Sequence, residues 1–358
     1  MGLIKGTEIK YRSTKHPRPH KYKITVTLPL NIDLSRYDIY CPWVREIEIF
    51  GKGSLEVINI DRFLTVLDGR PPLPNLQHLT SCATAPVDGN KLMNFISMFI
   101  SPSLAEIRTV FPRDGLPKRS ISRVPSSSIP AFLRKIQETC PKIRVLEFYP
   151  EVDSVDTGSK KYTLSDRCRS ILSSFLNLRS FSSTTYLLDF TVLGILGELP
   201  CLQSLGIRGF PTELQVLDKK LSIPETWFQS LKELRLHDVH PEDIQTLWNQ
   251  PTIVQNLVSV LIQTDHLHAR NRDDDALYGT KWISPFLEAL PHLSPYLQDA
   301  YFFVGDEDLR VLIPQDMWKY VVSRDASPGD EYVSQAVFEI AWQLFGPDAS
   351  PSGSEESE

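Results

Sequence analysis

One pattern of apolar residues returns along most of this chain and limits the folds that it can adopt. In "FQSLKELRLH" (228–237), Leu231, Leu234 and Leu236 are spaced three and then two residues apart. A spacing of two is that of a strand with one buried face. In the following "HPEDIQTLW" (240–248), a histidine precedes a proline and two acidic residues, a composition typical of the first turn of a helix. The stretch therefore predicts a strand that is followed directly by a helix.

The same pattern returns in nine segments of the chain. They are "CPWVREIEIF" (41–50), "LPNLQHLTSC" (73–82), "SPSLAEIRTV" (101–110), "CPKIRVLEFY" (140–149), "FLNLRSFSST" (175–184), "LPCLQSLGIR" (199–208), "FQSLKELRLH" (228–237), "VQNLVSVLIQ" (254–263) and "SPYLQDAYFF" (294–303). Their first anchors, 24 to 40 residues apart, are Val44, Leu76, Leu104, Ile143, Leu178, Leu202, Leu231, Leu257 and Leu297. Helical patterns such as "SIPAFLRKIQETC" (128–140) occupy intervals between them. Such a unit cannot bury its apolar face alone, but stacked neighbours can.

The anchor spacing resembles the L-x-x-L-x-L of leucine-rich repeats, whose units each hold a strand and a helix. The resemblance implies an α/β fold: an irregular leucine-rich-repeat solenoid with a curved parallel sheet and helices on its convex side. The alternative is that the segments are ordinary amphipathic pieces of another α/β fold. Nine segments in one register favour the solenoid.

The repeats divide the chain into four predicted parts. Residues 24–305 form the solenoid, whose N-terminal strand cap is predicted from the alternating "YKITVTLPL" (22–30). Residues 1–23 hold seven Lys or Arg and one Glu, which favours a basic flexible tail over a nucleic-acid or localisation arm. Residues 306–346 indicate two helices that cap the last strand. Residues 347–358 are small, polar and acidic, as in a disordered tail.

Composition argues against several classes of function. The net charge of −6 gives no general reason to expect nucleic acid. No apolar run approaches the roughly 20 residues of a membrane helix. The five cysteines are odd in number and form no C-x-x-C motif, as in a reduced intracellular protein. We therefore expect an intracellular protein, in the cytoplasm or nucleus, that binds neither membrane nor nucleic acid.

No catalytic signature is present, so we expect a protein that is not an enzyme and needs no cofactor. The strongest metal candidate is "DHLHARNRDDD" (265–275), in which His266 and His268 precede a run of three carboxylates, Asp273, Asp274 and Asp275. On an extended segment the two imidazoles would lie on one side. The alternative is a solvated loop inside the longest interval between repeats. This loop is the basis of the alternative function, a metal-dependent protein or enzyme.

A protein-binding surface is predicted more directly than an active site. In a curved solenoid the strands line the concave face, where residues between the anchors point outward. Tyr and Arg are enriched at the energetic centres of protein interfaces. The predicted binding residues are Glu106, Arg108, Glu147, Tyr149, Arg208, Glu233, Arg235, His237 and Tyr301.

The turns before the anchors, "CP-x-[VI]-[RE]" and "LP-[NC]-L", resemble those in the leucine-rich-repeat half of fungal F-box proteins, over roughly residues 41–305. That resemblance implies the substrate-recognition part of a ubiquitin ligase. In that family an F-box, which usually opens with Leu-Pro followed by helices, binds a Skp1-type adaptor. Residues 1–40 hold a basic stretch and strand patterns instead. A Skp1-type adaptor is therefore expected as a partner only if a cryptic or missing F-box is supplied.

Overall fold

The structure is a computed structural model that describes residues 4–14, 21–51, 53–83, 89–109, 123–151, 162–209, 215–264, 282–304, 321–323 and 337–340. The chain forms two compact units. Unit 1 comprises Met1–Arg208 and Glu225–Ser230, and unit 2 comprises Gly209–Pro224 and Leu231–Glu358.

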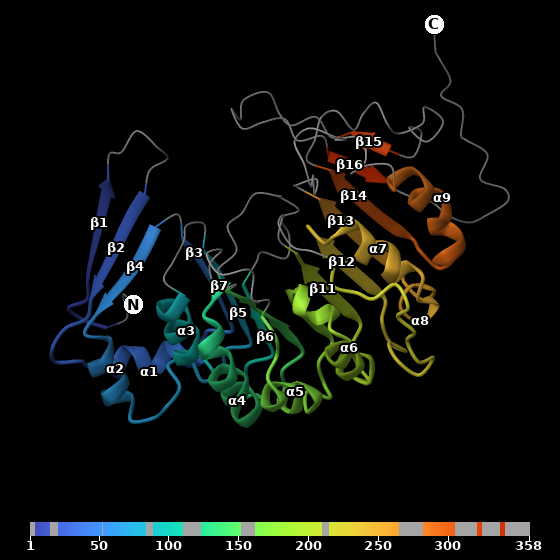
Figure 1. The fold of residues 1–358 in the computed structure, drawn as a ribbon. Helices are drawn as coiled ribbons and strands as arrows, with labels where there is room; N and C mark the ends of the chain where they lie inside the picture. The colour runs from blue at the N-terminus through green and yellow to red at the C-terminus, as the bar shows by residue number, and fades with distance from the viewer. Residues whose placement is uncertain are drawn as a thin grey trace, which may run out of the picture. The chain divides into compact units, whose positions relative to one another are not determined.

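Unit 1 begins with a small sheet of three strands, in the order β1 (Glu8–Thr14), β2 (Lys21–Thr27), β4 (Gly53–Ile58) (Figure 1). Strand β1 pairs antiparallel with β2, and β4 pairs parallel with β2. Residues 8–14, expected to belong to a flexible tail, therefore form a strand instead. Their alternating side chains suit a pleated sheet, and β2 supplies the partner that an isolated strand would lack. The helical elements here are α1 (Ser35–Tyr40), η1 (Cys41–Trp43) and α2 (Ile60–Leu67).

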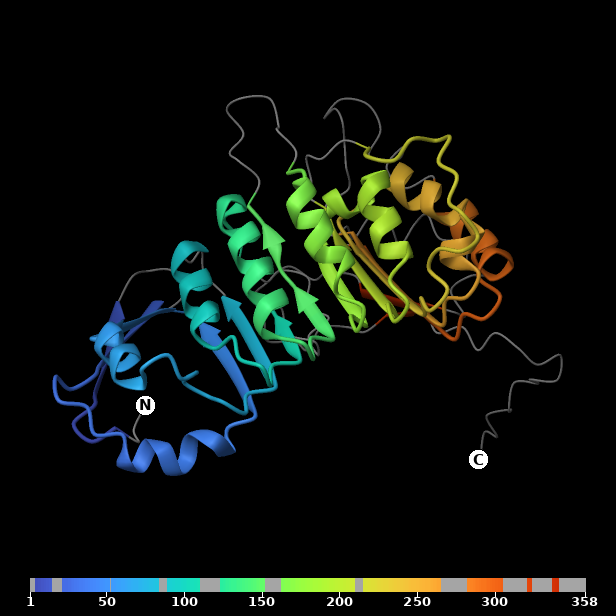
Figure 2. The ribbon, with the colours of Figure 1, turned by 90° about the horizontal axis from the view of Figure 1, so that it is seen from below.

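The main sheet of unit 1 is parallel, and its strands are neighbours in chain order. They are β3 (Glu46–Gly51), β5 (His78–Ala83), β6 (Glu106–Arg108), β8 (Val145–Glu147), β10 (Ser180–Thr184) and β11 (Ser204–Arg208). The connections contain α3 (Gly89–Met98), α4 (Ile129–Thr139), α5 (Asp166–Ser173) and α6 (Phe190–Gly197), which lie in a row on one side of the sheet (Figure 2). Shorter elements are η2 (Ser126–Ser128), η4 (Thr185–Leu188), and the paired strands β7 (Arg123–Val124) and β9 (Tyr149–Pro150). Parallel strands joined by helices confirm the predicted α/β class.

The predicted apolar anchors form the core of unit 1. The second anchors Leu79, Ile107, Leu146, Phe181 and Leu205 are aligned across neighbouring strands and are at most 1% exposed. Apolar side chains in one row bury each other's surface, and each such burial contributes about 1.5–3 kcal/mol relative to exposure. The anchor pattern is thus confirmed here as the source of the core.

A repeated backbone contact fixes the register between neighbouring strands. At the start of a strand, two successive amides donate to one carbonyl oxygen of the strand before it. In unit 1 the donor pairs and their acceptors are Gln77 and His78 to Arg45, Ala105 and Glu106 to Gln77, Arg144 and Val145 to Ala105, Arg179 and Ser180 to Arg144, and Gln203 and Ser204 to Arg179, over 2.7–3.1 Å. Since the contact involves backbone only, it tolerates any residue except proline at the donor positions.

A second repeated contact uses the residue immediately before the first anchor. Its side chain donates to the carbonyl oxygen of a proline in the preceding segment. The pairs are Asn75 Nδ2 to Pro42 (2.9 Å), Ser103 Oγ to Pro74 (2.8 Å), Asn177 Nδ2 to Pro141 (3.4 Å) and Ser230 Oγ to Pro200 (2.7 Å). A proline carbonyl at a turn is left without a partner in the ladder, and these side chains provide one.

Residues 225–230 belong to unit 1, where Trp227 packs against Gly194 and Gly197 of α6. A Cβ atom added at Gly197 would lie 2.6 Å from the Trp227 Cβ, and one at Gly194 would lie 2.9 Å from the Trp227 ring. The indole thus takes the space that larger residues on α6 would fill.

Unit 2 contains the parallel strands β12 (Glu233–His237), β13 (Ser259–Thr264) and β14 (Asp299–Val304). Its helices are α7 (Pro241–Trp248), α8 (Pro251–Val254) and α9 (Ile283–Leu293). The expected strand-to-helix switch after Leu236 is confirmed by β12 and α7.

The C-terminal part differs from the two expected helices over 306–346. Its described residues form β15 (Val321–Ser323) and β16 (Val337–Ile340), and β16 pairs antiparallel with both β14 and β15. The residues Val337, Phe338 and Ile340 favour strands. An edge strand with unpaired backbone groups is available at β14, and it outweighs the helical periodicity of the sequence.

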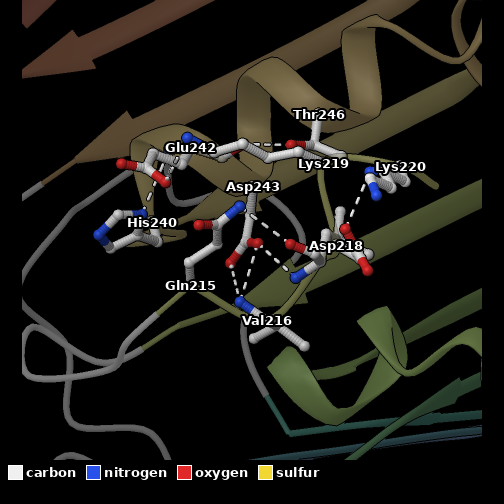
Figure 3. A network of polar contacts seen from close by, with 10 residues as sticks. Gln215, Val216, Asp218, Lys219, Lys220, His240, Glu242, Asp243 and Thr246 are labelled. Carbon is white, nitrogen blue, oxygen red and sulfur yellow. Dashed lines mark hydrogen bonds and ion pairs between the residues drawn. The ribbon is translucent and has the colours of Figure 1, made fainter.

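A buried carboxylate holds the segment 215–217 against α7 (Figure 3). Asp243, in the first turn of α7, is fully buried. Its oxygens accept the backbone amide of Val216 at 2.9 and 3.0 Å and that of Leu217 at 2.8 Å. Hydrogen bonds to a charged group are stronger than neutral ones, so this contact stabilises a segment that has no ladder of its own.

Gln250, just beyond α7, holds the same connection further along. Its Oε1 accepts the amide of Ile223 at 3.2 Å, and its Nε2 donates to the carbonyl oxygen of Leu221 at 2.9 Å. Residues 215–223 are therefore held at both ends of one helix.

We expect Asp243→Ala to lower the free energy of unfolding of unit 2 by about 3 kcal/mol, because it leaves two amides without their acceptor. Hydrogen exchange at Val216 and Leu217 measures the loss directly. The control is Glu242→Ala in the same helical turn, which removes only an exposed 3.5 Å ion pair with Lys219 and should cost no more than about 1 kcal/mol. Equal effects of the two substitutions would contradict the assigned role of Asp243.

Candidate binding surface

The main sheet of unit 1 has a face that turns away from α3–α6, here called the polar face. Strand pairing aligns its side chains in two rows across the strands. One row is Glu46, His78, Glu106, Val145, Ser180 and Ser204, and the other is Glu48, Thr80, Arg108, Glu147, Ser182 and Gly206. Both rows change from mostly long, charged side chains at β3–β6, Thr80 excepted, to small ones at β10 and β11. Opposite-charge neighbours in such rows stabilise a sheet modestly.

Glu106 is the centre of the charged half of the polar face. Its Oε2 lies 3.3 Å from both Nε and Nη2 of Arg108 and 3.4 Å from Nδ1 of His78. The structure thus brings together the predicted binding residues Glu106 and Arg108. Because both Arg108 contacts meet one carboxylate oxygen, the other oxygen, Oε1, makes no contact with the guanidinium.

In the other half, residues from three strands meet around Tyr149. Its hydroxyl donates to Glu147 Oε1 at 3.0 Å, and the guanidinium carbon of Arg208 lies 5.9 Å from the centre of its ring. Glu147 is 6% exposed and Tyr149 is 5% exposed. These three predicted residues therefore form one cluster, although Arg208 is far from the other two in sequence.

Two small residues pack tightly on the strands that follow Glu147 in the sheet. Ser182 on β10 and Gly206 on β11 are paired in register. A Cβ atom at Gly206 would lie 2.3 Å from Ser182 Oγ and 2.9 Å from Ser182 Cβ. The glycine is required because the two strands bring Ser182 directly against its Cα hydrogen. Sequence alone did not single out this pair, since the contact depends on strand register.

In unit 2 the predicted residues also form contacts with their neighbours. Arg235 Nε lies 3.6 Å from Glu233 Oε1, and His237 Nδ1 lies 3.0 Å from Gln263 Oε1. Gln263, on β13 beside His237, was not among the predicted site residues, although it directly follows the buried anchor Ile262 in the strand, which is a usable signal. Tyr301 lies on β14 opposite Leu261, but its side chain is outside the described part of the chain.

The described cysteines are poor candidates for nucleophiles. Cys41, Cys140 and Cys168 are buried free thiols, and Cys201 is half-buried. Burial raises the pKa of Cys140 from its ordinary value to about 11, and its thiol donates a hydrogen bond to the Ser101 carbonyl oxygen. Burial likewise raises the pKa of Cys41. Neutral thiols in apolar surroundings are inert, so these residues serve packing.

Within the described ranges, neither a metal site nor a membrane-spanning helix is found. They contain no group of three or more His, Cys, Asp or Glu residues placed to hold a metal ion. The predicted His266 and His268 loop, with Asp273–Asp275, lies outside those ranges. Among the described helices, none has the length and apolar character needed to cross a membrane.

The comparisons with family models and with curated proteins identified no relative of this chain. No family model matches the chain, and no curated protein matches it.

We expect Gly206→Ala to lower the free energy of unfolding by about 1–3 kcal/mol through overpacking against Ser182. Combining it with Ser182→Gly should restore part of that loss, because the clashing atoms are removed. A double-mutant cycle by urea denaturation measures the coupling. Additive effects would show that the two residues do not press on each other.

We expect alkylation near pH 8 to modify Cys201 before Cys41, Cys140 or Cys168, because the reagent reaches a half-buried thiol more easily than a buried one. Mass spectrometry of peptides assigns each site. Since the folded-state pKa of Cys140 is raised, the stability from its neutral thiol is fully present below pH 9.0 and is lost as the pH rises to about 11. Rapid labelling of Cys140 in the folded protein would contradict its burial.

Proposed function

We propose that this chain is a protein-interaction scaffold of the leucine-rich-repeat type and not an enzyme. The proposal assigns the binding role to the polar face of unit 1, with the residues of β12–β14 as a second contact region. The observation that carries it is the difference between the two faces of the unit 1 sheet. One face holds the apolar anchors and is covered by the helices, while the other holds charged and aromatic side chains that are held by contacts with one another.

Three features of the polar face support a role in recognition. Its charged groups are held by neighbours, so little side-chain freedom is lost when a ligand binds. It mixes both signs of charge, which favours a specific partner over any polyanion. It includes Tyr149 and Arg208, residue types that are enriched at the energetic centres of interfaces.

The resemblance to the repeat half of fungal F-box proteins extends the proposal to a pathway. On this interpretation the scaffold holds the substrate of a ubiquitin ligase inside the cell, and a Skp1-type adaptor joins it only through an F-box. The alternative of a metal-dependent protein rests on the His266 and His268 loop. No described contact favours that alternative.

The test is affinity purification of the tagged chain from its native cells, followed by mass spectrometry. We expect the double substitution Glu106→Arg with Arg108→Glu to remove the specific partners. The exchange keeps the net charge and allows the ion pair to re-form, but it reverses the pattern of charge. Recovery of a Skp1-type adaptor with a cullin would support the ligase role, and their absence would remove it.

A matched charge exchange controls for effects unrelated to the polar face. Glu138→Lys with Lys142→Glu exchanges two exposed charges at and just beyond the end of α4. This variant should retain all partners of the unmodified chain. If both exchanges retain every partner, the polar face is not the binding surface.

A further inference from the structure

Arg208 differs from the other predicted arginines of the binding surface in having no carboxylate partner among the described residues. Arg108 contacts Glu106 at 3.3 Å, and Arg235 contacts Glu233 at 3.6 Å. Arg208 instead lies over the Tyr149 ring. Its Nε is buried and has no hydrogen-bond acceptor within the described part of the protein.

An arginine in this state is energetically costly by itself. Leaving a buried donor without an acceptor is unfavourable, and contact with a tyrosine ring offsets only part of that loss. The ring contact nevertheless restricts the guanidinium. A restricted, partly desolvated guanidinium binds an incoming acceptor with little further loss of entropy.

The surroundings of Arg208 favour a carboxylate over a phosphate. Glu147 lies in the same cluster and accepts a hydrogen bond from the Tyr149 hydroxyl, which ties both groups together. Arg208 and Glu147 carry opposite formal charges. A phosphate, with close to two negative charges, would face Glu147 with only one cation to balance it, whereas a carboxylate carries one charge. A carboxylate also matches the two parallel N–H groups of a guanidinium.

We propose that Arg208 binds an aspartate or glutamate side chain of the protein ligand, so that the polar face recognises an acidic peptide segment. Tyr149 fixes the guanidinium, and Glu147 fixes the tyrosine through its hydroxyl. This inference rests on the proposed function and names the chemistry of its partner.

The test uses the full chain and a fluorescein-labelled peptide of alternating Glu and Ser, with the same peptide carrying Gln in place of Glu as its reference. Fluorescence anisotropy at low ionic strength should show binding of the Glu peptide that is at least about tenfold tighter than that of the Gln peptide. A peptide of phosphoserine and Gln should bind more weakly than the Glu peptide. Equal binding of the Glu and Gln peptides, or tighter binding of the phosphopeptide, would overturn the proposal.

Three variants connect the binding to Arg208. Arg208→Met should lose about tenfold or more in affinity for the Glu peptide, and Arg208→Lys should recover only part of it because it lacks the planar fork. Arg169→Ala is the matched control, since that arginine lies on α5, on the helical side of the sheet, and already pairs with Asp166, and it should bind as the unmodified chain does. Unchanged binding by Arg208→Met would refute the assignment.

Stability separates this role from a structural one. Because Nε has no acceptor among the described residues, Arg208→Met should unfold at the same temperature as the unmodified chain or higher. A large fall in that temperature would show that Arg208 serves the fold, and the proposal would fail. If cellular partners are retained by Arg208→Met but lost with the Glu106 and Arg108 exchange, the scaffold function stands and the acidic-peptide inference alone is wrong.

Discussion

The main sheet of unit 1 depends on one backbone interaction, the pair of successive amides that donate to a single carbonyl oxygen of the preceding strand. Gln77 and His78 make it to Arg45, and the same contact recurs along the sheet as far as Ser204. It sets the register, and register decides which side chains face the helices, because a shift of one residue would exchange the two faces. The apolar row from Leu79 to Leu205 and the polar face are thus two results of the same constraint.

The polar face changes in character across the sheet, and strand register brings its cluster together. Ser182 and Gly206 lie side by side on β10 and β11 in register with Glu147, and Thr184 is the residue of β10 that pairs with Arg208, whose guanidinium lies over the Tyr149 ring. The Glu147 carboxylate then meets the tyrosine hydroxyl. A surface built in this way has few mobile side chains, which suits recognition more than it suits stability, since buried polar groups rarely repay their desolvation in full.

Unit 2 shows how a connection without regular structure is held in place. Residues 215–223 cannot satisfy their amides through a ladder, so Asp243 and Gln250 accept them from the two ends of α7. Because Asp243 lies in the first turn of α7, its negative charge was expected to interact favourably with the helix dipole. Its larger role is to bind Val216 and Leu217, a partnership that helical position cannot indicate.

The sequence by itself determined the α/β class, the buried anchors and the switch from β12 to α7, because spacings of two and of three to four residues are local consequences of strand and helix geometry. It also placed Glu106 and Arg108 on one face. Tertiary structure decided what depends on distant partners. Residues 8–14 became a strand because β2 lies beside them, 337–340 paired with the edge of β14, and Arg208 reached Tyr149 across a neighbouring strand. Periodicity shows which way a side chain points, but only the packed chain shows what it meets.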